Sequence, residues 1–283
     1  MSSPGYRLED VGGAARLEQF GERLVDRPAP AALGARGDPA RWAAADLRFE
    51  RDRGWAGPGV AAAPWPIEIA GLTLELRATA AGQVGLFPEH LAMLPWLRAQ
   101  VAARATGGDG DAPAVLHLFA YTGLATLAMA SAGAAVTHLD AARPTVAWAR
   151  QNAEASGVAD RPIRWIVDDA VPFTGREIRR GRRYDGVVLD PPSYGHGPGS
   201  GAWRIEMHLA SLLGAVARVL EPDGFVLLTA HTPGFDADRL AHDLGRALGR
   251  NADAVQAGDL SLETADGRRL ELGAFARSTG GAS

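Results

Sequence analysis

The sequence contains no cysteine among its 283 residues. Disulfide bonds, cysteine-ligated zinc and a cysteine nucleophile are therefore excluded. The chain also lacks an excess of positive charge, because 29 Lys and Arg stand against 33 Asp and Glu, a net charge of −4. This balance argues against a broadly basic nucleic-acid clamp and leaves room only for a local basic patch. The length allows one large domain, or one domain with an appendage.

No signal peptide is visible, because the first residues, MSSPGYRLED, lack a basic region followed by an apolar one. We therefore expect a cytoplasmic protein. The stretch from Ala112 to Leu139 has no Asp, Glu, Lys or Arg and is long enough to cross a bilayer. It also contains two histidines, two glycines and apolar runs of strand length, so a buried β-α-β unit is favoured over a membrane helix.

Val115 to Asp140 has the pattern of such a unit. An apolar run, Val115 to Phe119, enters a turn that ends at Gly123, and a helix of small residues and a second apolar run follow. The second run ends on Asp140. In a β-α-β unit the ligand lies at the carboxyl ends of the strands, where this carboxylate could accept hydrogen bonds from a ribose. Because the turn has one glycine instead of G-x-G-x-x-G, a nucleoside-like ligand without a pyrophosphate is favoured over a dinucleotide.

A second motif follows a later apolar run, where Asp190-Pro191-Pro192-Ser193-Tyr194 comes after Val187 to Leu189. Together, FAYTG at residues 119–123 and DPPSY at residues 190–194 resemble motifs of the Rossmann-like S-adenosylmethionine-dependent methyltransferases. The resemblance is to the branch related to bacterial 23S ribosomal-RNA large-subunit methyltransferases, and it covers about Gln83 to Ala276. It implies S-adenosylmethionine as cofactor and an RNA substrate, with ribosomal RNA suspected.

The same resemblance implies an α/β fold with a mostly parallel seven-stranded sheet and helices on both faces. We expect a small β-rich extension at residues 1–80 and the methyltransferase domain at residues 81–283. Hairpins are predicted around Gly12-Gly13 and Ala70-Gly71, with an interruption at residues 26–30. Trp42 and Trp55 are interpreted mainly as local core, with base stacking as the alternative.

In the larger domain the expected strands after the β-α-β unit are 163–167, 184–189 and 225–229, with a turn at 221–224. The expected helices are 90–104, 143–156, 172–181, 202–220 and 236–250. Two last strands, near 252–257 and 270–276, are expected to form an antiparallel edge.

Carboxylates recur at the ends of successive strands, at Asp140, Asp168, Asp169 and Asp190. Each alone is equally well a turn residue or a helix cap, but their recurrence at one sheet edge favours a binding site. By resemblance, Asp140 accepts from the cofactor ribose and one of Asp168 and Asp169 accepts from the adenine amino group. Asp169 is favoured because it precedes Ala170. The remaining cofactor-binding residues implied are Phe119, Ala120, Tyr121, Thr122, Gly123, Ala141 and Asp190, and Ala120 to Gly123 form the wall beside the methionine part.

The DPPSY turn is the candidate catalytic element, with Asp190, Pro191, Pro192 and Tyr194. Two prolines make the turn stiff and leave outward-facing carbonyls that could hold an amine nucleophile in line with the sulfonium methyl. Tyr194 could stack on a planar substrate. Alternatively, the turn only ends a strand and Tyr194 only packs.

Further substrate-binding candidates are Phe87, in the segment before the first domain helix, and His196, in a glycine-rich loop that is interpreted as a substrate gate. Since methylation of pyrimidine C5 normally uses a cysteine, a nitrogen acceptor fits this chain better. Where relatives carry that cysteine, after the fifth strand, this chain reads Leu228 to Pro233, and His231 in this segment is either near the acceptor or structural. The histidines show no metal-ligand spacing, so no metal is expected.

Five arginines lie between residues 176 and 183. They are interpreted either as a solvated helix face balanced by acids or as contacts to RNA phosphates. Two other functions stay open: methylation of a small molecule or protein side chain, which the acidic net charge favours mildly, and a non-catalytic protein that binds cofactor or RNA. The oligomeric state is not indicated.

Overall fold

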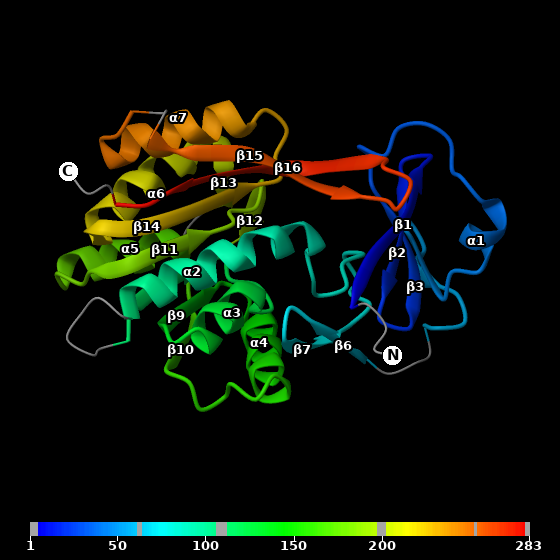
Figure 1. Ribbon diagram of the computed structural model, residues 1–283, viewed down its shortest axis with the longest axis horizontal. Helices are drawn as coiled ribbons and strands as arrows, with labels where there is room; N and C mark the ends of the chain where they lie inside the picture. The colour runs from blue at the N-terminus through cyan, green and yellow to red at the C-terminus, as the bar shows by residue number, and fades with distance from the viewer. Residues whose placement is uncertain (1–4, 61–63, 106–111, 197–201, 252–253, 281–283) are drawn as a thin grey trace. The chain divides into compact units, whose positions relative to one another are not determined.

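The computed structural model describes residues 5–60, 64–105, 112–196, 202–251 and 254–280 (Figure 1). The chain forms two compact units. The first comprises Met1–Ala92 and Ser261–Leu272, and the second comprises Met93–Leu260 and Gly273–Ser283. The boundary expected from the sequence lay at residue 80, and the return of residues 261–272 to the first unit was not expected.

The first unit contains a five-stranded sheet in the order β1-β2-β3-β4-β5. Its strands are β1 (Tyr6–Gly12), β2 (Ala15–Phe20), β3 (Arg23–Pro28), β4 (Leu47–Glu50) and β5 (Gly54–Ala56). A short helix, α1 (Pro39–Ala43), precedes β4, and β6 (Trp65–Ile69) pairs with β7 (Leu72–Leu76) as a separate hairpin. Both predicted hairpins are confirmed. The predicted interruption at residues 26–30 is wrong in part, because β3 continues to Pro28, which a strand end tolerates.

Trp42 of α1 belongs to the core of this unit, as predicted. Its ring is buried with Leu17 and Leu24, and its indole Nε1 donates to Asp10 Oδ2 at 2.5 Å. Asp10 also accepts from the backbone N–H of Gly37 at 2.8 Å and pairs with Arg268 at 2.6 Å. The carboxylate of Asp10 therefore joins β1, the loop before α1 and the turn at residues 264–268.

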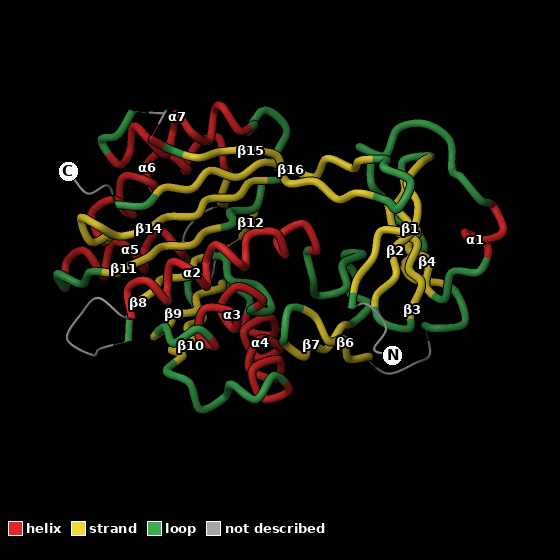
Figure 2. The backbone as a smooth tube through the Cα atoms, viewed as in Figure 1, coloured by secondary structure: helices red, strands yellow, loops and turns green. Residues whose placement is uncertain are grey.

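The second unit contains a seven-stranded sheet in the order β10-β9-β8-β11-β14-β16-β15 (Figure 2). Neighbouring strands from β10 to β14 run parallel, whereas β16 is antiparallel to β14. The α/β fold is confirmed, and the sheet is mixed. The strands are β8 (Ala114–Leu118), β9 (Ala135–Asp140), β10 (Ile163–Val167), β11 (Tyr184–Leu189), β14 (Leu220–Ala230), β15 (Gln256–Glu263) and β16 (Arg269–Ser278).

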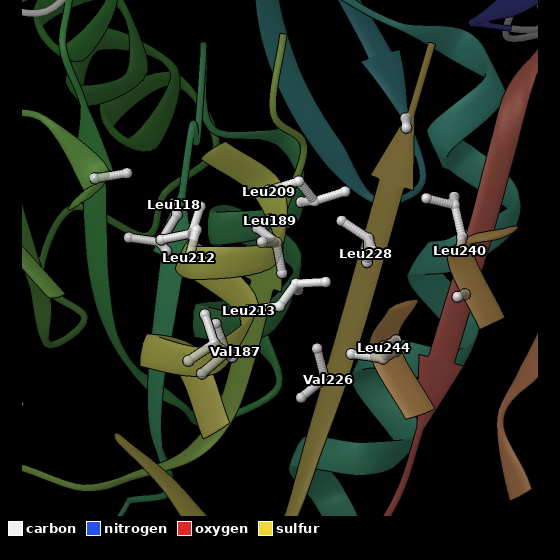
Figure 3. Close-up of a cluster of buried hydrophobic side chains, with 14 of the residues drawn as sticks. Leu118, Val187, Leu189, Leu209, Leu212, Leu213, Val226, Leu228, Leu240 and Leu244 are labelled. Atoms are coloured by element: carbon white, nitrogen blue, oxygen red, sulfur yellow. The ribbon is translucent and has the colours of Figure 1, made fainter. Parts of the chain in front are cut away.

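The helices form two groups. In one, α5 (Ala170–Arg179), α6 (Ile205–Val219) and α7 (Ala237–Leu248) pack in succession; in the other, α2 (Leu94–Ala105) packs on α3 (Leu124–Ser131), and α4 (Arg143–Ala155) covers β9 and β10. Leucines at helical spacing on α6 lie among the side chains of β8, β11 and β14 and next to those of α7 (Figure 3). This burial fixes the strand ends that carry the acidic residues.

Some predicted boundaries were wrong. The first residues of the predicted helix 202–220 form β13 (Ala202–Arg204), which pairs with β12 (Tyr194–His196), so α6 begins at Ile205. The predicted helix 90–104 begins with a 3₁₀ turn, η1 (Pro88–Met93). The expected turn 221–224 lies within β14. The strand expected near 252–257 is β15, which begins later and extends to Glu263.

The charge-free stretch from Ala112 to Leu139 is divided into β8, α3 and β9, as predicted. Among the residues that the structure describes, no helix is both long and apolar enough to cross a membrane.

Candidate cofactor and active site

The FAYTG turn lies between β8 and α3 and is held in an uncommon backbone conformation. Phe119 and Tyr121 have φ angles of 55° and 49°, in the left-handed region that residues with a side chain rarely adopt. Gly123 has a φ of 94°, and a Cβ atom there would lie 3.3 Å from Ala149 Cβ. Only glycine suits both conditions. Such conformations cost about 1–3 kcal/mol each and are concentrated at functional sites.

Neighbouring strands hold this turn in place. The N–H of Ala120 donates to the Leu139 carbonyl at 3.0 Å, and the amide of Asn152 donates to the Thr122 carbonyl at 2.9 Å. The Phe119 ring packs on Trp203, with centroids 5.2 Å apart. These contacts tie the turn to β9, α4 and β13.

Asp140, the last residue of β9, joins the loops that follow β8 and β9. Its Oδ2 accepts from the N–H of Tyr121 at 3.0 Å, and its Oδ1 accepts from the N–H of Ala142 at 2.9 Å. Burial raises the pKa of the Asp140 carboxyl, and the two N–H groups oppose that rise. Each carboxylate oxygen can accept a second hydrogen bond, so the group is able to bind two ribose hydroxyls. Ala141 follows it, half-buried.

Asp168 and Asp169 follow β10. The carboxylate of Asp168 pairs with Arg176, and its backbone N–H donates to the Asp140 carbonyl at 3.2 Å. Asp169 is the N-cap of α5, accepting from the N–H of Val171 at 3.1 Å. Asp169 thus has the helix-capping role that the sequence left open for these acids. The single capping hydrogen bond leaves its carboxylate able to accept from a second partner.

The DPPSY turn follows β11. Asp190 Oδ1 accepts from the Thr229 hydroxyl at 2.6 Å and lies 3.4 Å from His231 Nε2. Tyr194 is 50% exposed, and the Arg204 guanidinium lies 5.8 Å from its ring centroid. Half of the tyrosine surface is thus accessible for stacking.

One expectation for this turn needs correction. The Pro192 carbonyl does not simply face outward, because it accepts a hydrogen bond from the indole Nε1 of Trp203 at 2.7 Å. Trp203 lies in β13, which pairs with the strand that begins at Tyr194. The same indole packs on Phe119, so Trp203 connects the DPPSY turn to the FAYTG turn. No sequence pattern predicts this role, since a tryptophan after a glycine-rich loop has no distinctive spacing.

The registers of the parallel strands place all these groups at one edge of the sheet. Leu118 pairs with Leu139 and with Leu189, Val167 pairs with Asp140, and Leu189 pairs with Leu228. The residues that follow these positions therefore emerge side by side. The expected juxtaposition of FAYTG, Asp140, Asp168 and DPPSY is present.

The arginines between residues 176 and 183 are largely engaged within the second unit. Besides the pair of Arg176 with Asp168, Arg180 pairs with Glu177 at 2.7 Å and Arg183 donates to the Leu220 carbonyl at 2.7 Å. This supports the interpretation as a balanced helix face. The ion pair of Arg176 with Asp168 was not predicted. Side chains on a helix lean toward its N-terminus, so Arg176 on α5 points back toward the end of β10.

The two other substrate candidates from the sequence, Phe87 and His196, lie outside the FAYTG and DPPSY turns. Phe87 belongs to the first unit, where its ring lies 5.9 Å from that of His90. His196 pairs through its backbone with Ala202, and the rest of the proposed gating loop, residues 197–201, lies outside the described residues.

Comparison with known proteins bears on this edge directly. A family model described as an S-adenosylmethionine-dependent methyltransferase matches residues 21–255. The chain belongs to that family of enzymes. S-adenosylmethionine, the cofactor of this family, fits the strained turn, the spare acceptor capacity of Asp140 and the adjoining acids. The turn lacks the glycine pattern that a pyrophosphate needs.

A solved S-adenosylmethionine-dependent methyltransferase from Agrobacterium tumefaciens is 35% identical, with a TM-score of 0.89, over 99% of this chain and 92% of that one. A putative methyltransferase from Streptococcus mutans shares the fold at 15% identity, with a TM-score of 0.74 over 98% of this chain and 75% of that one.

Among curated relatives, the ribosomal RNA large subunit methyltransferase K/L of Methylococcus capsulatus is 33% identical over 128 residues, 44% of this chain and 17% of that protein. The protein of the same name from Magnetococcus marinus is 28% identical over 172 residues, 60% of this chain and 22% of that protein. The methyltransferase is therefore related to ribosomal-RNA methyltransferases, and it matches about a fifth of their length.

Proposed function

We propose that this methyltransferase transfers the methyl group of S-adenosylmethionine to a nucleobase nitrogen in RNA, with ribosomal RNA as the candidate substrate. The names of the curated relatives support an RNA substrate. The observation that carries the nitrogen acceptor is the DPPSY turn beside an exposed tyrosine, in a chain without cysteine. Such a substrate would place the protein in the cytoplasm.

In this proposal, Asp140 accepts from the ribose hydroxyls and Asp169 accepts from the adenine amino group. The wall formed by residues 119–123 borders the methionine part, and Ala141 lines the ribose. The cofactor supplies an already activated methyl on its sulfonium. The protein therefore contributes mainly alignment and exclusion of water. We also propose that residues 81–283 form the catalytic domain and residues 1–80 an accessory extension.

Asp190 and the carbonyls of the proline turn would accept the N–H groups of the substrate and orient the nitrogen lone pair toward the methyl carbon. Since Pro192 already accepts from Trp203, Asp190 and Pro191 carry most of this role. Tyr194 would stack on the base. The substrate nitrogen would lose a proton on accepting the methyl group from the sulfonium, and the Asp190 carboxylate, 3.4 Å from His231 Nε2, would take up that proton.

The test is transfer of tritium from labelled S-adenosylmethionine to total RNA of a strain that lacks the gene. We expect label in ribosomal RNA, retained as an N-methyl base after digestion to nucleosides. Label in a C5-methyl pyrimidine would refute the acceptor assignment, and no label in any RNA fraction would refute the RNA substrate.

The acidic net charge favours a second candidate, methylation of a small molecule or a protein side chain. The same assay with a small-molecule extract and a protein extract separates it from the first. Asp190→Ala distinguishes an enzyme from a protein that only binds: the variant should bind S-adenosylhomocysteine and lose all transfer.

A further inference from the structure

The first unit contains a cavity of about 280 Å³ that lies outside the methyltransferase motifs. Arg16 of β2, Arg27 of β3 and Arg51 of the β4–β5 turn all line it, together with Phe49, Gly82 and Gln83. Among the described residues that line it, none carries a carboxylate. A concave site bordered by three guanidinium groups attracts an anion.

Two of these arginines share one buried carboxylate. Arg27 binds Glu18 through two hydrogen bonds, from Nε to Oε2 at 2.7 Å and from Nη2 to Oε1 at 3.0 Å, and its Nη1 donates to Gln83 at 2.9 Å. Burial alone would raise the pKa of Glu18, but Arg16 and Arg27 outweigh it and lower that pKa. Glu18 is therefore ionised, and its single charge is already matched by the bidentate pair with Arg27.

Arg16 is the second cation beside this carboxylate. Its side chain is 7% exposed, and its Nε lies 3.4 Å from Glu18 Oε2. Within the described part of the chain, neither Nε nor Nη1 of Arg16 makes a hydrogen bond. A buried guanidinium in this state is costly unless another group compensates its charge. Glu89 interacts with Arg27 from outside the cavity lining, and counting it still leaves the exposed Arg51 as an additional positive charge.

Another part of the cavity lining is closely built. Gly82 has a φ of 77°, and a Cβ atom there would lie 2.7 Å from the Phe49 ring, so the loop of residues 80–83 lies flat against that ring. Thr79 closes the loop by hydrogen bonds with Gln83. The cavity thus combines a fixed aromatic wall with buried and exposed guanidinium groups. Arginine in such a setting suits an oxyanion, because its planar fork matches two oxygens of a phosphate as it does those of a carboxylate.

We propose that this cavity binds a phosphate group, with Arg51 as the accessible contact and the buried Arg16 as a second guanidinium beside it. Two sources share this chemistry: a phosphodiester of an RNA strand and a free phosphate. The inference goes beyond the proposed function and does not require it, since the cavity belongs entirely to the first unit.

The test compares Arg51→Gln with Arg53→Gln in the full-length protein. Both residues are exposed in the turn between β4 and β5, and only Arg51 lines the cavity. The two variants therefore lose the same net charge at nearly the same place. Arg16 is left intact, because its removal would change the compensation of buried Glu18 and with it the stability of the fold.

In the RNA arm, binding of a single-stranded 12-nucleotide RNA is measured by fluorescence anisotropy from 50 to 400 mM salt. We expect Arg51→Gln to lower the slope of log affinity against log salt by about 0.7, the value for one phosphate on a single strand. If the variant and the wild type bind equally at 1 M salt, this change of slope corresponds to about an eightfold loss of affinity at 50 mM salt. Arg53→Gln should leave the slope unchanged.

In the second arm, inorganic phosphate is titrated at constant ionic strength and the rise in Tm is recorded. A rise that Arg51→Gln abolishes and Arg53→Gln retains, without an effect on RNA binding, identifies a free phosphate as the source. Both variants should keep the wild-type affinity for S-adenosylhomocysteine, which reports on the second unit. If Arg51→Gln and Arg53→Gln behave alike in both arms, the proposal is wrong, whatever the outcome of the methyl-transfer assay.

Discussion

Replacement of Asp140 by alanine tests the proposed cofactor site most sharply. The variant removes the carboxylate that is proposed to bind the ribose hydroxyls and leaves the N–H groups of Tyr121 and Ala142 without their present acceptor. A hydrogen bond to a charged group contributes about 1.5–3 kcal/mol. Loss of one such bond should therefore raise the Kd of S-adenosylhomocysteine by about 10- to 150-fold, and loss of both by more.

The assay is isothermal titration calorimetry with S-adenosylhomocysteine near neutral pH, with circular dichroism to confirm that the variant folds. Asp160→Ala is the matched control, because Asp160 is exposed in the loop before β10, at the opposite ends of the strands. It should bind as the wild type does. Wild-type affinity in Asp140→Ala would refute the assignment of the ribose site.

Four other results are expected. Burial raises the pKa of Asp140, so affinity for S-adenosylhomocysteine should fall on acidification at a higher pH than an exposed aspartate would produce; titrations from pH 7 to pH 4 would show it, and a flat profile would contradict it. Gly123→Ala should destabilise the second unit by about 1–2 kcal/mol in urea, because it forces a Cβ atom into the left-handed region against Ala149; an unchanged midpoint would be contrary to this reasoning. Trp203→Phe removes the hydrogen bond to Pro192 but keeps a ring near Phe119, and should lower methyl transfer more than cofactor affinity; equal losses would instead indicate general damage to the fold. Burial alone would raise the pKa of Asp10, but hydrogen bonds from Trp42, Gly37 and Arg268 lower it, so Asp10 stabilises the fold above its unfolded pKa and loses this effect as the pH falls through its folded pKa. Asp10→Asn should therefore reduce the acid sensitivity of Tm below about pH 4. Identical pH profiles of Tm for the variant and the wild type would disprove this.

The order of elements in the second unit could be predicted because each element has its own local pattern. Val115 to Phe119 and Tyr184 to Leu189 are apolar runs of strand length, and Asp236 caps its helix with an ordinary side-chain bond. Parallel strands bring their carboxyl ends to one edge, so the meeting of Asp140 with the DPPSY turn followed from the order of elements alone.

The long-range contacts could not be predicted in this way. Trp203 reaches Pro192 and Phe119 only because residues 202–204 form a strand that pairs with residues 194–196, and nothing in the local pattern of Ala202–Arg204 indicates a strand. The turn at residues 264–268 joins the first unit through Arg268 and Asp10, which are far apart in sequence. Likewise, the cavity near Arg16 depends on segments from β2 to residue 83.

A crystal structure of the protein with S-adenosylhomocysteine is the measurement that tests the account most directly. We expect both ribose hydroxyls within hydrogen-bond distance of the Asp140 carboxylate, and the sulfur between the turn of residues 119–123 and the turn of residues 190–194. A ligand bound with its ribose away from Asp140, or with its sulfur turned away from Asp190 and Tyr194, would contradict the proposed site.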